Sequence, residues 1–424
     1  MIQLAYIREN KQDVINRLAI KNIDATAAIE EIIALDQEKR KAQTEVELLL
    51  SEQNTLAKQI GELFKSGKKA EADDMRNRST AIKELAKGYE EKLAKLDDDL
   101  KNALVVLPNI PSPSVPRGKT PEENEVVFLN EKNMPKLDDD ALPHWELTAK
   151  YDIIDFELGN KIAGAGFPVY KGQGAKLQRA LINFFLDQAT KAGYYEIQPP
   201  ILINEESGFG TGQLPDKEGQ MYHVTADNLY LIPTAEVPVT NIFRDTIVKA
   251  EEMPIKCTAY TPCFRREAGS YGAHVRGLNR LHQFDKVEIV QIAHPDSSYK
   301  ILEEMRNYVC SLLDLLELPY RTLKLCGGDM SFASALTYDM EVWSGAQKRW
   351  LEVSSVSNFE SFQANRLKLR YREGNEKPVL AHTLNGSALA LPRIVASLLE
   401  NNQSKDGIRI PAALVPYTGF DIIK

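Results

Sequence analysis

Two predicted strands, at 257–267 and 282–293, carry charged and aromatic side chains whose spacing could do chemistry. Side chains alternate between the faces of a strand, so one face of this hairpin presents an arginine, an imidazole, two carboxylates and an aromatic ring. These are Arg265, His282, Glu267, Glu288 and Phe284. Arginine suits a phosphate, an aromatic ring can stack on a nucleobase, and a carboxylate can hold an ammonium group or a metal ion. The alternative is a solvated sheet face with incidental ion pairs, and the hairpin alone does not decide.

Two further segments combine an acid with hydroxyl groups. Thr234-Ala235-Glu236 follows a short strand, and the plain reading is a helix cap beside a favourably placed acid. Glu352-Val353-Ser354-Ser355 lies in a predicted strand at 349–356, where Glu352 and Ser355 are candidates for contacts with magnesium or phosphate.

A fourth segment runs from Asn385 through Ser387 to Arg393 and continues into a predicted helix. Ser387 is a candidate helix cap. Arg393 is unusual near a helix start, because basic residues favour the other end. A helix N-terminus with an added arginine suits an anion such as a nucleotide phosphate.

Neither cysteine nor histidine spacing predicts a metal centre. The four cysteines form no CxxC pair, and the six histidines include no HExxH pattern, so we expect no zinc. Free thiols in a reducing cytosol are the expectation for the cysteines.

Residues 28–104 are predicted to form an element that contains none of the candidate site residues. Apolar residues recur there with spacings of three and four, the heptad pattern of a coiled coil, in two runs separated by a turn at 66–69. The runs are Ala42, Val46, Leu49, Gln53, Leu56, Ile60 and Leu63, then Ile82, Leu85, Tyr89, Leu93, Leu96 and Leu100. We expect a long antiparallel hairpin with helices of roughly 55 Å, at about 1.5 Å per residue. A dimerisation element or spacer is the plain alternative.

Prolines divide this region from the rest of the chain. The sequence predicts an N-terminal domain at 1–107, a proline-rich linker at 108–121 and a catalytic domain at 122–424. A helix at 174–191 and several alternating strands favour an α+β domain built on an antiparallel sheet with flanking helices.

Composition and charge limit the classes of protein to which this chain can belong. The 424 residues carry a net charge of −8, which argues against coating nucleic acid through bulk charge. No apolar run approaches the roughly 18 residues that a membrane helix needs, and the N-terminus does not look like a signal peptide. We therefore expect a cytoplasmic protein.

Taken in order, these segments resemble the class II aminoacyl-tRNA synthetases. Phe264-Arg265-Arg266-Glu267 with the strand ending in Glu288 resembles motif 2, 384–393 resembles motif 3, and 174–200 resembles motif 1. Within the class, the seryl enzymes of bacterial type are the nearest likeness. The segments that carry it are Thr234-Ala235-Glu236, Glu267-Ala268-Gly269-Ser270-Tyr271-Gly272, His282-Gln283-Phe284-Asp285-Lys286, Glu352-Val353-Ser354-Ser355 and the N-terminal hairpin. Ala388, Ala390 and Pro392 depart from the glycines common in motif 3.

The resemblance implies a serine--tRNA ligase activity with ATP as substrate, Mg²⁺ bound through ATP, and the helical arm holding the long variable stem of serine tRNA. It implies Arg265, Glu267 and Arg393 as catalytic residues, with adenine between Phe284 and Arg393. The nucleotide set it implies is Arg265, Arg266, Glu267, Phe284, Glu352, Val353, Ser354, Ser355 and Arg393, with Glu352 and Ser355 also at the Mg²⁺. The serine set it implies is Thr234, Ala235, Glu236, Arg265, Glu288, Asn385 and Ser387.

Two other functions share the same motifs. One is an amino acid:carrier-protein ligase of the same fold, against which the long arm argues. The other is a non-catalytic RNA-binding paralogue, against which the joint presence of Arg265, Glu267, Glu352 and Arg393 argues. The resemblance also implies a homodimer and leaves open whether selenocysteine tRNA is a second substrate.

Overall fold

The computed structural model describes residues 1–216, 218–267 and 275–424. The chain forms two compact units. One comprises Met1–Ala19 and Ile23–Pro108, and the other comprises Ile20–Asn22 and Asn109–Lys424. Within the described ranges, no helix is long and apolar enough to cross a membrane.

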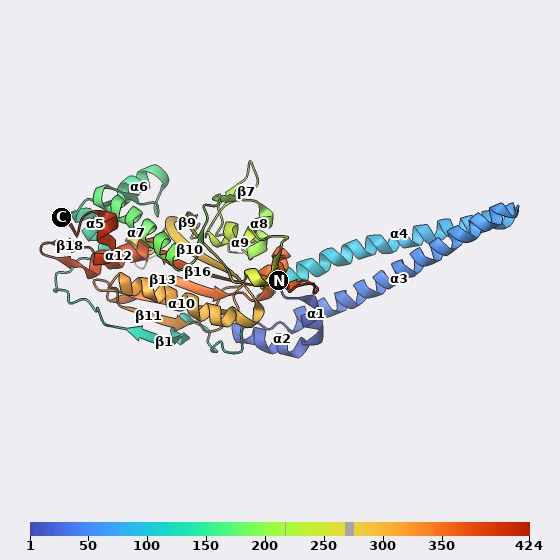
Figure 1. The fold of residues 1–424 in the computed structure, drawn as a ribbon, viewed down its shortest axis with the longest axis horizontal. Helices are drawn as coiled ribbons and strands as arrows, with labels where there is room; N and C mark the ends of the chain where they lie inside the picture. Colours follow the sequence, from blue (N-terminus) through green and yellow to red (C-terminus); the bar gives the residue numbers. More distant parts are fainter. Residues whose placement is uncertain (217, 268–274) are drawn as a thin grey trace. The chain divides into compact units, whose positions relative to one another are not determined.

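The first unit is dominated by two long paired helices, joined by a tight turn with Gly67 at a positive φ of 77°. Two short helices precede them (Figure 1). The four are α1 (Leu4–Glu9), α2 (Lys11–Leu18), α3 (Thr26–Lys65, 40 residues) and α4 (Lys69–Val105, 37 residues). The predicted helical hairpin is confirmed.

The packing seam of this hairpin follows the heptad prediction with one correction. Leu85, expected in the seam, is 56% exposed, whereas Ala86 is 4% exposed. With Ala86, the spacings from Ile82 onward alternate strictly between four and three, as a continuous coiled-coil stripe requires. Ion pairs between Lys39 and Asp97 and between Glu52 and Arg78 fix which residues face each other across the hairpin.

The second unit is built on an eight-stranded sheet in the order β1-β11-β12-β13-β16-β10-β9-β4. All neighbours are antiparallel except β4 and β9, which are parallel. The strands are β1 (Glu125–Asn130), β4 (Tyr195–Glu196), β9 (Ile255–Phe264), β10 (Gln283–Ala293), β11 (Tyr320–Lys324), β12 (Leu336–Ser344), β13 (Arg349–Asn358) and β16 (His382–Ala390). The predicted α+β fold on a largely antiparallel sheet is confirmed.

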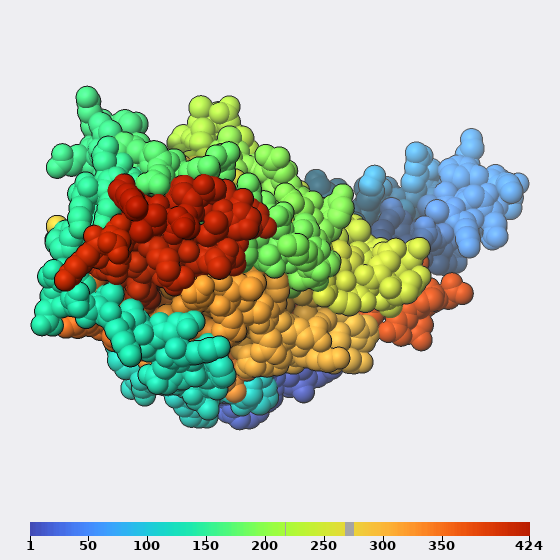
Figure 2. Space-filling model, turned by 60° about the vertical axis from the view of Figure 1, so that its left-hand side comes forward, coloured from blue at the N-terminus to red at the C-terminus, as the bar shows by residue number. Residues whose placement is uncertain are grey.

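Three amphipathic helices pack their apolar faces on this sheet: α7 (Gly172–Lys191), α10 (Ser298–Leu315) and α12 (Leu391–Asn401). The end of the chain lies on the surface of this unit (Figure 2), where the Tyr417 hydroxyl donates to Asp187 of α7 at 2.8 Å. The other helices are α5 (His144–Lys150), α6 (Phe156–Ala163), α8 (Glu205–Thr211), α9 (Glu236–Asn241), α11 (Ser361–Leu367) and α13 (Val415–Thr418).

The remaining short strands form smaller sheets of two or three strands. They are β2 (Ile154–Asp155), β3 (Val169–Tyr170), β5 (Leu202–Ile203), β6 (His223–Val224), β7 (Leu229–Leu231), β8 (Ile247–Lys249), β14 (Arg370–Arg372), β15 (Val379–Leu380), β17 (Gln403–Ser404), β18 (Gly407–Arg409) and β19 (Ile422–Ile423).

One local prediction is wrong. Ser387 is not a helix cap, because β16 continues to Ala390 and α12 begins at Leu391.

Candidate active site

Four buried polar residues meet where β10 passes the start of α9. Lys286 donates from Nζ to the Thr234 hydroxyl at 2.9 Å and lies 2.7 Å from the Glu288 carboxylate. Thr234 Oγ1 in turn accepts the Glu236 backbone N–H at 3.2 Å. The N-cap of α9 is Ala235, so Thr234 is not the helix cap of the plain reading. Alternation along β10 puts Lys286 and Glu288 on one face. The predicted serine set contains Thr234, Glu236 and Glu288, and the structure brings these three residues together. Lys286, which is absent from that set, lies among them.

The two carboxyl groups of this cluster, those of Glu236 and Glu288, differ in the groups that stabilise their negative charge. Burial raises the pKa of Glu236 to about 7, against an opposing hydrogen bond from Gln363. Burial also raises the pKa of Glu288, and the neighbouring Lys286 charge opposes that rise. Among the described residues, Glu288 has an ion-pair partner and Glu236 has none. Glu236 is therefore the carboxylate best placed to receive a positive group from outside the chain.

Arg265, directly after β9, and Phe284, on β10, stand beside this cluster. The Arg265 guanidinium carbon lies 5.2 Å from the centre of the Phe284 ring, and its Nε donates to the Pro233 carbonyl at 3.4 Å. An aromatic face and a guanidinium next to buried carboxylates can receive a base, a phosphate and an ammonium group together.

The first strand of the hairpin ends at Phe264, and Glu267 lies three residues beyond it in a left-handed conformation, with φ of 50°. Such a backbone costs a non-glycine residue about 1–3 kcal/mol and tends to occur at functional sites. Its carboxylate forms an ion pair with Arg280, on the other arm of the hairpin. Arg266 donates its backbone N–H to Gln220 at 2.9 Å. The predicted segment Ala268–Gly272 lies outside the described residues.

A second polar cluster lies on β13, between β12 and the start of α12. The Ser355 hydroxyl donates to Asp339 at 2.5 Å and lies 3.4 Å from Glu352. Arg393 Nη1 donates to the Glu352 carbonyl at 2.7 Å and lies 3.7 Å from its carboxylate. Burial and the charge of Glu352 raise the pKa of Asp339 well above its ordinary value.

This second cluster fits a divalent cation only in company with a ligand. Carboxylate and hydroxyl oxygens suit magnesium, and Mg²⁺ usually takes one or two carboxylates with the rest of its shell from water and substrate phosphates. Across the described part of the chain, no group of three or more His, Cys, Asp or Glu could hold a metal. Glu352 and Ser355 therefore fit an ion that arrives with a nucleotide.

Four predicted residues have more limited roles in the geometry. Val353 is 1% exposed and packs in the core, so only its backbone could reach a ligand. Ala235 is also buried, directly before α9. The Ser354 hydroxyl donates to the Ser387 carbonyl at 2.5 Å, joining β13 to β16. Asn385, half-buried, shares the face of β16 with Ser387.

Sequence reasoning missed Lys286, Gln363 and Thr383 as parts of the site. Gln363 donates to the Glu236 carboxylate at 2.7 Å and lies on α11, outside the predicted segments. Lys286 could have been found, because it alternates with Phe284 and Glu288 on the same strand face.

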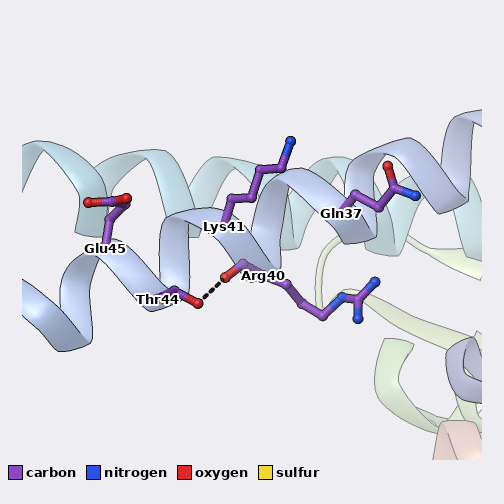
Figure 3. A pocket seen from close by; sticks show the side chains of 5 residues that line it. All are labelled: Gln37, Arg40, Lys41, Thr44 and Glu45. Carbon is purple, nitrogen blue, oxygen red and sulfur yellow. Dashed lines mark hydrogen bonds between the residues drawn. The ribbon is translucent and has the colours of Figure 1, made fainter.

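A surface hollow on α3 is unrelated to these clusters (Figure 3). Its lining residues all belong to this one helix, and the hydrogen bond within it, from the Thr44 hydroxyl to the Arg40 carbonyl at 3.0 Å, is an ordinary helix contact. The lining residues are Gln37, Arg40, Lys41, Thr44 and Glu45. They carry both signs of charge and offer no catalytic combination.

Comparison with known proteins bears on what these clusters do. The family model described as "Seryl-tRNA synthetase N-terminal domain" matches residues 1–111, and that for "tRNA synthetase class II core domain (G, H, P, S and T)" matches residues 222–402. The serine--tRNA ligase of Salinibacter ruber is 51% identical over 99% of this chain and 98% of that protein. That of Chlorobium luteolum is 46% identical over 100% and 99%.

Solved structures agree. The crystal structure of seryl-tRNA synthetase from Pyrococcus horikoshii complexed with ATP superimposes with a TM-score of 0.92 at 32% identity, covering 100% of this chain and 99% of that one. The cytoplasmic serine--tRNA ligase of Naegleria fowleri in complex with AMP has a TM-score of 0.89 at 24% identity, which shows a shared fold. The resemblance in the sequence is thus confirmed: the chain belongs to the seryl-tRNA synthetase family of class II aminoacyl-tRNA synthetases.

Proposed function

We propose that the protein activates L-serine with ATP to seryl-adenylate and transfers the seryl group to the 3′ end of serine tRNA. The observation that carries the proposal is the buried Glu236 carboxylate, which has no cationic partner among the described residues and lies in one cluster with Arg265 and Lys286. An ammonium group beside Glu236 and a phosphate beside Arg265 would bring the two halves of this reaction together.

Serine would bind with its ammonium group on Glu236. Its hydroxyl would meet Thr234 and the Lys286–Glu288 pair, which offers donors and acceptors at 2.7–2.9 Å spacing and little net charge. Asn385 and Ser387 face the same side of the sheet and complete the proposed serine set. Because such a site is built to hydrogen-bond a hydroxyl, it should reject alanine more strongly than threonine.

ATP would bind across the two clusters. Its adenine would lie between Phe284 and Arg393, with Glu267 and Arg266 near the base and sugar, and its α-phosphate would meet Arg265. The Arg265 guanidinium now rests over the Phe284 ring, so a base stacking there would need it to turn toward the phosphate. The backbone and hydroxyl groups of Ser354, Ser355 and Val353 lie along the strand that would follow the phosphates.

The chemistry needs no covalent protein intermediate. A serine carboxylate oxygen attacks the α-phosphorus, pyrophosphate leaves, and a ribose hydroxyl of the terminal tRNA adenosine then displaces AMP from the activated carbonyl. Positioning of the two reactants and charge neutralisation by arginine account for such catalysis. A Mg²⁺ ion held by Glu352 and Ser355 would neutralise phosphate charge when bound. Asp339, which accepts the Ser355 hydroxyl at 2.5 Å, would orient that hydroxyl.

The remaining partners follow from the family and the arm. We propose that the hairpin of α3 and α4 holds the variable stem of serine tRNA, that α7 and the segment after it form a homodimer interface, and that the protein acts in the cytoplasm. The division into a domain at 1–107, a linker at 108–121 and a domain at 122–424 also stays a proposal. Selenocysteine tRNA would be a second substrate only if the arm accepts its stem.

The deciding experiment is amino-acid-dependent exchange of pyrophosphate into ATP, run with each of the twenty amino acids and no tRNA. Exchange with serine alone is the expected result. Exchange with a different amino acid would overturn the specificity. Serine exchange followed by loading of a carrier protein, with no charging of tRNA, would favour the carrier-protein ligase.

A further inference from the structure

A hydrogen-bond chain runs from the central sheet through α11 into the proposed serine site. The Thr383 hydroxyl on β16 donates to Gln363 Oε1 at 2.7 Å, and Gln363 Nε2 donates to Glu236 Oε1 at 2.7 Å. The same Nε2 donates to the Thr211 carbonyl at 3.2 Å. Gln363 is 1% exposed and Thr383 is fully buried.

The order of donors and acceptors fixes how this chain works. A side-chain amide can present either its oxygen or its NH₂ group to a neighbour. Here Thr383 occupies the amide oxygen of Gln363, and both hydrogens of Nε2 have acceptors. Gln363 can therefore only donate to Glu236. A flipped amide would set an oxygen against both the Glu236 carboxylate and the Thr211 carbonyl, which can only accept, so these two acceptors fix the orientation of Gln363. The Thr383 hydroxyl, which can donate or accept, satisfies the amide oxygen.

Glu236 depends on this donor more than the other acids of the site do. Three charged groups act on its carboxylate, namely Glu288, Lys286 and Arg265. Glu288 repels its charge, whereas Lys286 is already 2.7 Å from Glu288 and bonded to Thr234. Among the described side chains, the hydrogen-bond donor to the Glu236 carboxylate is Gln363.

We propose that Gln363, oriented by the Thr211 carbonyl and with its amide oxygen satisfied by Thr383, is a positioning residue for amino acid recognition that favours the ionised form of Glu236 and aims it at the substrate ammonium group. This inference rests on the proposed function, because it assigns Glu236 to the ammonium of the activated amino acid. The inference adds a requirement to the proposed serine-binding set. The Glu236 carboxylate needs a neutral hydrogen-bond donor such as Gln363 behind it, since a second cation there would compete with the substrate ammonium group.

The pH dependence of serine use should report this role. Burial raises the pKa of Glu236 to about 7, and the Gln363 hydrogen bond opposes that rise. Without the donor the pKa rises further, and more of the carboxyl group is neutral at pH 7. A neutral Glu236 offers no charge to the ammonium group, so the acid limb of kcat/KM for serine should move to higher pH.

The test uses full-length Gln363→Met, which keeps volume and loses the donor to Glu236, and Thr383→Val, which keeps shape and leaves the Gln363 amide oxygen without its donor. Thr148→Val is the control, because Thr148 is equally buried and its hydroxyl, among the described residues, donates to the Trp145 carbonyl within α5. In pyrophosphate exchange at pH 7, Gln363→Met should raise the KM for serine roughly 10- to 100-fold, the scale of a hydrogen bond to a charged group. The KM for ATP should stay within about twofold, since the described side-chain hydrogen bonds of Gln363 go to Thr211, Glu236 and Thr383, which lie outside the nucleotide set.

Two further readings separate positioning from general damage. Thr383→Val should raise the KM for serine less than Gln363→Met, and the double variant should match Gln363→Met, because both act on one chain. The acid limb of kcat/KM for serine should shift upward in both variants and not in Thr148→Val. Unchanged serine KM and pH profile would overturn the proposal, as would equal losses for serine and ATP. An active wild type with unchanged variants refutes this inference alone, whereas a wild type without serine exchange refutes the proposed function.

Discussion

Arg393 donates from Nη1 to the backbone carbonyl of Glu352 at 2.7 Å, which joins the first turn of α12 to strand β13. Its Nε donates at 3.0 Å to the carbonyl of Asn279, in the turn that closes the charged hairpin. Two backbone oxygens from separate segments therefore set the plane of the guanidinium. The Glu352 carboxylate, at 3.7 Å, is a weaker partner.

This anchoring predicts a contrast between two conservative substitutions. Arg393→Lys should lower kcat/KM for ATP by roughly 100-fold, because a lysine ammonium is a point charge and cannot reproduce the planar fork. The backbone contacts of Arg393 survive in Glu352→Gln, which should mainly shift the Mg²⁺ concentration that exchange requires. Exchange kinetics with ATP and Mg²⁺ varied separately would measure both. Equal effects of the two substitutions on ATP would contradict separate roles.

Arg265 provides the second prediction. Its guanidinium carbon lies 5.2 Å from the centre of the Phe284 ring, and the guanidinium is expected on the α-phosphate. Arg265→Ala should lower serine-dependent exchange by at least about 100-fold, the scale for losing one oriented donor to the transition state. Arg306→Ala is a suitable control, because Arg306 also packs over an aromatic ring, that of Tyr338, outside both clusters. Near-normal exchange by Arg265→Ala would refute the phosphate role.

Helices and strands could be predicted from the sequence wherever their residue pattern is local. Heptad spacing predicted the hairpin of α3 and α4, and period-two alternation predicted β9, β10, β12 and β13. The prediction of the packing seam was wrong where a small residue occupies it. Leu85 has the larger apolar side chain, but Ala86 keeps the 4-3 alternation from Ile82 and is the one buried. Register outweighed hydrophobicity at that point.

The site was predictable only for residues within recognisable segments. Lys286 shares a strand face with Phe284 and Glu288, so alternation could have included it. Gln363 could not be found in this way, because it reaches Glu236 from a helix 127 positions further along the chain. No periodicity links such residues, and only the packing of α11 against the sheet brings them together.

The ion pairs of the arm suggest a truncation that tests its role. Removing residues 45–88 and joining Thr44 to Tyr89 by a short Gly-Ser turn keeps the Lys39–Asp97 pair at the retained base. Serine-dependent exchange should stay near the wild-type rate, since no cluster residue is removed, and charging of serine tRNA should fall at least 100-fold, the scale of about 2.7 kcal/mol of lost contacts. Filter-binding of tRNA would show whether affinity is lost. Full charging by the truncated protein would contradict the tRNA-binding role.

The corrected seam predicts unequal costs for two leucines of α4. Leu96 is 6% exposed, whereas Leu85 is 56% exposed. Leu96→Ala should destabilise the hairpin by about 2–3 kcal/mol, at the lower end for buried leucine, because the pair of helices can partly close the gap. Leu85→Ala should change the stability by less than about 0.5 kcal/mol. Urea unfolding followed by circular dichroism measures both. A larger loss from Leu85→Ala would restore the original seam.

Lys21 gives a prediction for pH. Its ammonium group is buried in the second unit, where it donates to the carbonyl oxygens of Ser334 at 2.8 Å and Ser331 at 2.9 Å. No carboxylate pairs with it among the described residues. Burial lowers its pKa to about 7, against about 10.4 in an unfolded chain. Between these values the unfolded state holds one more proton, so the free energy of unfolding should rise with pH by up to about 1.4 kcal/mol per unit. Below pH 7 both states are protonated and this dependence ends.

The matched variant is Lys21→Met, which keeps the length of the side chain and removes the titration. The thermal midpoint of the wild type, relative to this variant, should climb from pH 7 to pH 9.5 and be flat from pH 5.5 to pH 6.5. Differential scanning calorimetry at constant ionic strength would follow it, and Lys405→Met, at an exposed turn, controls for loss of a surface charge. A difference independent of pH would mean that Lys21 stays protonated when folded. The carbonyl oxygens around it would then hold the ammonium form strongly enough to offset its burial.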